Sequence, residues 1–86
     1  MEMKPITEED VLNSKFCKIH ESLMKITATI PPLKKAEMLD YRTLCVIVGI
    51  LGLRVRCLPG SVKNANYWLK NHTKEELLDL FKDEFV

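Results

Sequence analysis

The sequence predicts an all-α fold, a compact bundle of four to five helices around a fully apolar central helix. The strongest indication is the stretch Leu44–Leu53, which contains no polar side chain and must therefore be covered on every side. A second is helical spacing of apolar residues between Leu12 and Ile30, and a third is the helix-start signals before other segments. The apolar run is too short to cross a membrane, which takes about 20 residues, so we interpret it as a core element.

Composition limits the class of protein. A chain of 86 residues is the size of one domain, and residues 1–6 are expected to be a flexible N-terminus. The net charge of +1 gives no general attraction to nucleic acid, and no membrane contact is expected. The N-terminus lacks the apolar segment of a signal peptide, and an odd number of cysteines argues against a disulfide framework. These features predict an intracellular protein, cytoplasmic or nuclear.

The first predicted helix starts after Thr7, which is followed by three acidic residues that suit the positive end of a helix dipole. Apolar positions then recur at alternating steps of four and three residues, the heptad seam of a helix packed lengthwise on another. This seam consists of Leu12, Phe16, Ile19, Leu23, Ile26 and Ile30. The pair Pro31–Pro32 ends the helix, because proline has no N–H to donate to the helical ladder.

A short amphipathic helix is expected over 33–39, and Asp40 is a suitable N-cap for the central helix. Within Leu44–Leu53 the β-branched residues favour a strand, so a buried strand remains the alternative. We prefer a helix because no convincing partner strand lies nearby in the sequence, and a lone strand is not stable. Gly52 then suits the left-handed residue that ends a helix, with Leu53 folding back on Val48. Gly49 is expected to permit close helix packing.

The C-terminal third predicts two more helices. Pro59–Gly60 is typical of a turn, and Ser61 is a candidate cap for a helix that ends near Asn71. Its inward positions are Val62, Ala65 and Leu69. Thr73 and Glu76 have the spacing of a capping box, which predicts the start of the last helix. The apolar stripe of that helix is Leu77, Leu78, Phe81 and Phe85.

No residue pattern predicts catalysis. Cys17 and His20 have a spacing that can chelate a metal on one helix face, but two ligands do not complete a site. The sequence has no glycine-rich phosphate loop, and no nucleophile can be assigned a base and an orienting acid. We therefore predict that the protein is not an enzyme, with no catalytic, cofactor-binding or metal residues and no small-molecule substrate.

The predicted function is non-catalytic binding of a protein. The long apolar seam exceeds what so small a domain can bury, and apolar side chains at the C-terminus would otherwise be lost to fraying. This excess of apolar surface predicts a regulatory or adaptor module that binds another protein or a second copy of itself. The candidate contact residues are Phe16, Ile19, Leu23, Phe81 and Phe85.

The alternative prediction is nucleic-acid binding. Basic and aromatic side chains follow the central stretch, in an order that loosely resembles a helix-turn-helix arrangement. The connection over residues 53–61 is longer than the three- or four-residue turn of that motif, which ranks this prediction second. The candidate residues are Arg54, Arg56, Lys63, Tyr67 and Lys70.

Overall fold

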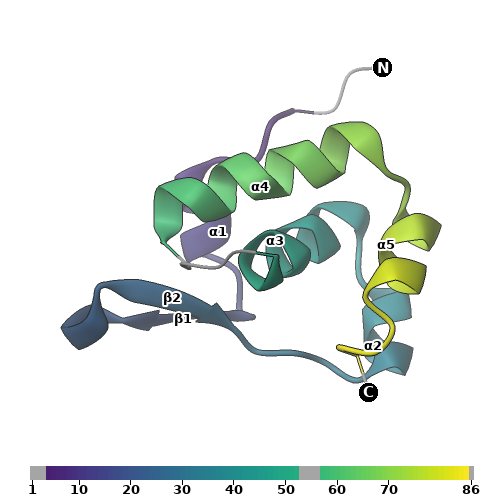
Figure 1. Ribbon diagram of the computed structural model, residues 1–86, viewed down its shortest axis with the longest axis horizontal. Helices are drawn as coiled ribbons and strands as arrows, with labels where there is room; N and C mark the ends of the chain where they lie inside the picture. Colours follow the sequence, from purple (N-terminus) through teal and green to yellow (C-terminus); the bar gives the residue numbers. More distant parts are fainter. Residues whose placement is uncertain (1–3, 53–56, 86) are drawn as a thin grey trace.

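The computed structural model describes residues 4–52 and 57–85, and these residues form five helices and one two-stranded sheet (Figure 1). In chain order the elements are α1 (Glu8–Leu12), β1 (Cys17–His20), the 3₁₀ turn η1 (Glu21–Leu23), β2 (Lys25–Ala28), α2 (Leu33–Met38), α3 (Tyr41–Leu51), α4 (Leu58–Asn71) and α5 (Lys74–Leu80). The molecule is therefore mixed α/β, and the all-α prediction is wrong.

The error lies in the segment predicted as one long helix from Thr7 to Ile30. Thr7 does cap α1, and its side chain and that of Asp10 form a capping box, but the helix ends at Leu12. The chain then forms an antiparallel hairpin in which β1 pairs with β2. The heptad seam therefore does not exist as one face of one helix.

A second period in the same residues explains the hairpin. In β1 the less polar Cys17 and Ile19 alternate with Lys18 and His20, which is the period of a half-buried strand. Strand β2 includes β-branched Ile and Thr side chains, which favour extended backbone. Between α1 and β1, Ser14 favours a turn over a helix, and its C=O accepts the N–H of Cys17 at 3.1 Å.

Helix α3 forms the centre of the core, and the preference for a helix over a buried strand is confirmed. Asp40 caps it by accepting the N–H of Thr43 at 3.4 Å, and the whole run Leu44–Ile50 is buried. Helix α4 packs against α3 at Gly49, where an added Cβ would lie only 2.8 Å from Cβ of Ala65. Gly49 thus permits the close helix packing that the sequence predicts.

The start of α4 and the end of α3 differ from prediction. Helix α4 begins at Leu58, and Pro59 lies in its first turn, where a missing N–H costs nothing. The predicted turn at Pro59–Gly60 is therefore wrong, and Ser61 is buried inside the helix instead of capping it. Gly52 has φ −77°, so the left-handed ending predicted there is also wrong. Leu53 lies outside the described residues.

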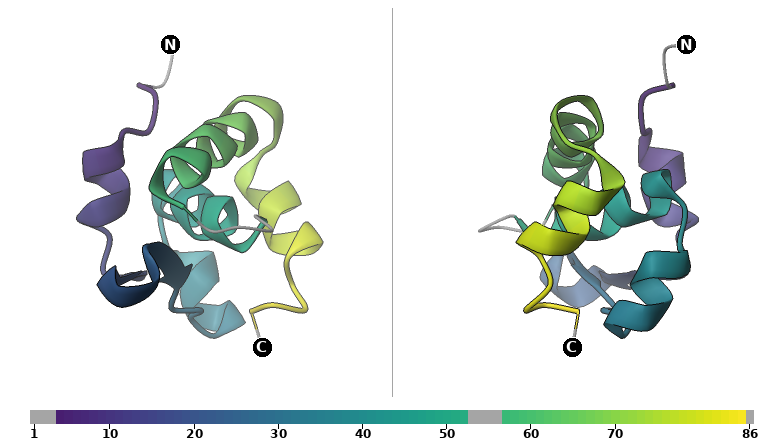
Figure 2. Two further views of the ribbon diagram at one scale, coloured as in Figure 1. Left: turned by 60° about the vertical axis from the view of Figure 1, so that its left-hand side comes forward. Right: turned by 90° about the vertical axis from the view of Figure 1, so that its right-hand side faces the viewer.

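The remaining elements cover the α3–α4 pair. Figure 2 shows α1 and α5 on opposite sides of it. Ile6 is buried, and its N–H and C=O bond to the amide of Asn66 at 2.7 and 2.9 Å, which anchors the end of the segment expected to be flexible. The predicted capping box of Thr73 and Glu76 is confirmed at the start of α5. No helix in the described ranges has the length and apolar character needed to cross a membrane.

Candidate functional site

The hairpin extends to one end of the molecule and carries the most exposed group of apolar side chains (Figure 1). Its register places Ile19 directly opposite Ile26, so both side chains lie on the same face of the sheet. Ile26 is 4 % exposed and belongs to the core, whereas Ile19 is 53 % exposed. The inner face of the hairpin thus runs past the edge of the core and leaves Ile19 largely uncovered.

The hairpin tip, by which we mean residues 19–24, holds two further exposed apolar side chains. Leu23 is 62 % exposed, and Met24 is 89 % exposed. Met24 has φ 51° and ψ 39°, the left-handed conformation that costs a residue with a Cβ about 1–2 kcal/mol. Glycine or asparagine would adopt this conformation more easily. The tip therefore carries a large apolar side chain at a strained position, where it adds little to the core.

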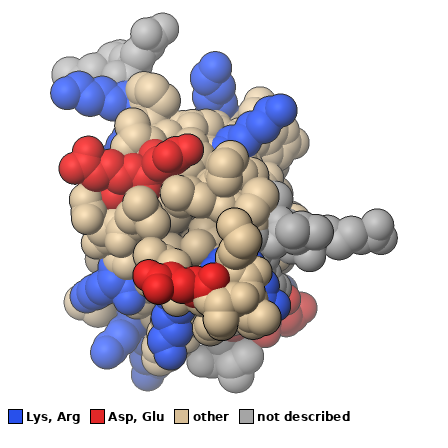
Figure 3. All heavy atoms as spheres, turned by 90° about the vertical axis from the view of Figure 1, so that its left-hand side faces the viewer, with Lys and Arg blue, Asp and Glu red and all other residues tan. Residues whose placement is uncertain are grey.

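The opposite face of the hairpin is polar and basic. Lys18 and Lys25 lie on this face with His20 and Thr27, and the His20 Nε2 is 2.9 Å from the Thr27 hydroxyl. Lys15, just before β1, is also exposed, and none of these three lysines forms an ion pair with another described residue. Figure 3 looks on to this end of the molecule, where blue side chains gather at the lower left. The apolar hairpin tip is therefore bordered by positive charge.

The hairpin also separates the two residues with metal-ligand spacing. Cys17 and His20 are three residues apart, and in a strand such side chains point to opposite faces. Burial raises the pKa of the Cys17 thiol, which favours its protonated form over the thiolate that binds metals. Within residues 4–52 and 57–85, no three His, Cys, Asp or Glu side chains are grouped so that they could hold a metal ion.

Three candidates for nucleic-acid contact lie together on α4. Lys63, Tyr67 and Lys70 are exposed, and their spacing of four and three residues puts them on one face of the helix. Tyr67 is 53 % exposed, and its ring contacts Trp68 edge to face at 5.3 Å between centroids. The other two candidates, Arg54 and Arg56, lie outside the described residues.

The aromatic residues predicted as C-terminal contacts take part in the core. Phe85 is 1 % exposed, and the ring of Phe81 packs edge to face on Trp68 at 5.4 Å. Phe16, at the base of the hairpin, is half-buried against the core. Of the five residues predicted to contact a protein, Ile19 and Leu23 are thus the two that this structure exposes strongly.

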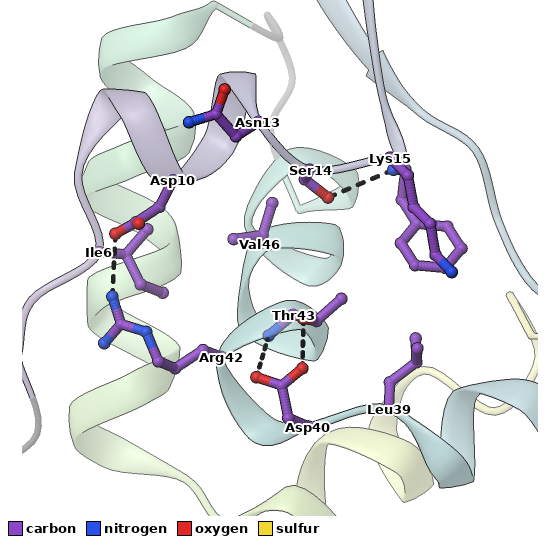
Figure 4. Close-up of a pocket in the computed structure, with 11 residues that line it drawn as sticks. Ile6, Asp10, Asn13, Ser14, Lys15, Leu39, Asp40, Arg42, Thr43 and Val46 are labelled. Atoms are coloured by element: carbon purple, nitrogen blue, oxygen red, sulfur yellow. Dashed lines mark hydrogen bonds and ion pairs between the residues drawn. The ribbon is translucent and has the colours of Figure 1, made fainter.

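A groove of about 510 Å³ lies between α1, the loop before β1 and the start of α3 (Figure 4). Its apolar lining is Ile6, Phe16, Leu39 and Val46. Its charged groups are paired among themselves: Arg42 meets Asp10 at 2.9 Å, and Asp40 bonds to Thr43. Because these groups already have partners, they do not define a ligand of particular chemistry.

The sequence interpretation missed Met24 and the two hairpin lysines, Lys18 and Lys25. A strand period over residues 17–20 and 25–28 was the signal that could have found the lysines, since it places them on one face. Nothing in the sequence pattern indicated the left-handed backbone of Met24. Comparisons with protein-family models, with curated proteins and with solved structures find no match to this chain.

Proposed function

We propose that the protein is a non-catalytic module that binds another protein through its hairpin tip. The observation that carries this proposal is the group of exposed apolar side chains of Ile19, Leu23 and Met24 at one end of the molecule. Single exposed apolar residues are common on proteins, but a group of them is typical of an interaction surface.

The conformation of Met24 supports the same proposal. A left-handed methionine that is almost fully exposed costs folding free energy and returns little of it through packing. Strained residues of this kind occur preferentially at functional positions. Methionine also suits a contact surface, because its flexible, polarisable side chain adapts to the shape of a partner.

The test begins by identifying the partner through the tip itself. Leu23 is replaced by a photoreactive amino acid, the cross-linked protein is identified, and its purified form is titrated with the unmodified chain. Met24→Asn should then weaken binding by at least about tenfold, the loss expected for an important contact residue. The same substitution should leave folding stability unchanged or slightly higher, because asparagine tolerates the left-handed conformation.

Met38→Asn is the matched control for this experiment. Met38 is 86 % exposed, almost as much as Met24, but it lies on α2, away from the hairpin. We expect Met38→Asn to leave the affinity unchanged. If Met24→Asn binds the purified partner as tightly as the unmodified chain does, the tip is not the contact surface.

Nucleic-acid binding is the second candidate, favoured by the exposed row of Lys63, Tyr67 and Lys70 on α4. Lysines can neutralise phosphates, and an exposed tyrosine can stack on a base. Two lysines and a net charge of +1 make a weak site, so we expect affinities no tighter than about micromolar at physiological salt. Changing both lysines to alanine should reduce the salt dependence of binding to single-stranded DNA by about two in slope. A salt dependence unchanged by this double substitution would remove the candidate.

A further inference from the structure

The outer edge of β1 has backbone groups that are free to pair. At the open end of the hairpin, the N–H of Thr29 donates to the C=O of Phe16 at 2.6 Å, so these two residues are a hydrogen-bonded pair. Because such pairs alternate along an antiparallel ladder, the next one is Lys18 with Thr27. Ile19 falls between hydrogen-bonded pairs, and its N–H and C=O therefore point away from β2.

The neighbouring residue agrees with this assignment. The N–H of Cys17, which points the same way, donates to the C=O of Ser14 outside the strand pair. No hydrogen bond from another described part of the chain reaches the backbone of Ile19. An edge of this kind is a template on which an extended segment of another chain can add as a third strand.

The side chains of β1 define what such a segment must contain. The partner residue opposite Ile19 would lie on the same face as this exposed apolar side chain, so an apolar residue fits there. The partner residues on either side would face the opposite way, toward Lys18 and toward His20 with Lys25 behind it. Acidic residues fit these positions, because the lysines have no carboxylate partner among the described residues.

We infer that the edge of β1 binds an extended segment of a partner protein in which apolar and acidic residues alternate. This inference rests on the proposed function and specifies the class of partner. Charge argues for a foreign segment over a second copy of this chain. The hairpin and its approach, residues 15–28, contain three lysines and one glutamate, so two copies paired along β1 would bring like charges together.

The inference is tested with a short capped peptide of alternating valine and glutamate. We expect saturable binding to the ¹⁵N-labelled protein, with slower hydrogen exchange at the Ile19 amide, which points into the new strand. Lys18→Glu should weaken binding by at least about fivefold, the upper range for a cross-strand ion pair, and should create binding to a valine–lysine peptide. Lys34→Glu, an equivalent change at an exposed lysine of α2, should alter neither titration.

Three results would overturn the inference. One is no binding of the valine–glutamate peptide up to about 1 mM, and another is equal binding of a peptide with its glutamates and valines in separate blocks. The third is concentration-dependent protection of the Ile19 amide without peptide, together with a dimer in sedimentation, which would identify a second copy as the occupant. If the peptide fails while Met24→Asn still disrupts the purified complex, strand pairing is wrong and the function proposed for the tip stands.

Discussion

At the scale of the single residue, Gly49 determines how closely the two longest helices approach. An added Cβ at this position would meet the Cβ, Cα and backbone nitrogen of Ala65 at 2.8–2.9 Å. Two of these three atoms belong to the backbone of α4, so a rotamer change could not relieve the contact. A side chain at position 49 would therefore push the helices apart, and core packing at native density leaves little freedom for that.

We expect Gly49→Ala to lower the free energy of unfolding by about 1–3 kcal/mol, the usual cost of overpacking a core. The sign is informative, because alanine in a helix interior without a clash is about 1 kcal/mol more favourable than glycine. Urea denaturation followed by circular dichroism measures the change. Gly52→Ala is the control: below 3 Å its Cβ would meet only the Asn64 amide, the end of a flexible side chain. A stabilised Gly49→Ala would show that the helices are not in close contact.

At the scale of the element, the hairpin shows how one stretch of sequence can satisfy two periods. Leu12, Phe16, Ile19, Leu23 and Ile26 fit a heptad, but residues 17–20 and 25–28 also fit the two-residue period of strands. Helix interiors tolerate the residues at both ends of this stretch poorly, since Asn13 and Ser14 favour turns and Thr27 and Thr29 are β-branched. Spacing alone does not decide between the periods, and the pairing of β1 with β2 does.

The two isoleucines that face each other across the hairpin distinguish these structures. Ile26→Ala should lower the free energy of unfolding by about 2–4 kcal/mol, because Ile26 is buried against the core. Ile19→Ala should cost less than about 1 kcal/mol, because this side chain is largely exposed. A single amphipathic helix would bury both residues on one face and make the two costs similar. Parallel urea titrations of both variants measure the difference.

Local signals predicted the helical part of the fold well, and their limits have physical causes. Caps at Thr7, Asp40 and Thr73 depend on side chains that bond to backbone groups three residues away, so the sequence alone indicates them. The candidate site depends instead on pairing between residues seven or more positions apart. Neither the exposure of Ile19 nor the left-handed backbone of Met24 can be derived without knowing where the hairpin ends relative to the core.

At the scale of the whole molecule, the C-terminal segment completes the core. Phe85 is almost fully buried, although it lies five residues beyond the end of α5. Its N–H donates to the C=O of Phe81, and the chain end lies near α2 (Figure 1). A segment this close to a terminus would fray unless its side chains were held, and the aromatic ring provides the contact that holds it.

Phe85→Ala should therefore destabilise the folded chain, and the expected loss is about 3 kcal/mol, the lower end for a buried phenylalanine because a chain terminus can partly adjust. Domains of this size have only about 5–15 kcal/mol in total, so the urea midpoint should fall markedly. Leu80→Ala, a substitution at an exposed residue of α5, should change the free energy by less than about 0.5 kcal/mol. If Phe85 served a partner instead of the core, Phe85→Ala would leave the urea midpoint unchanged and weaken only the complex. Measuring both quantities on the same preparation separates the two roles.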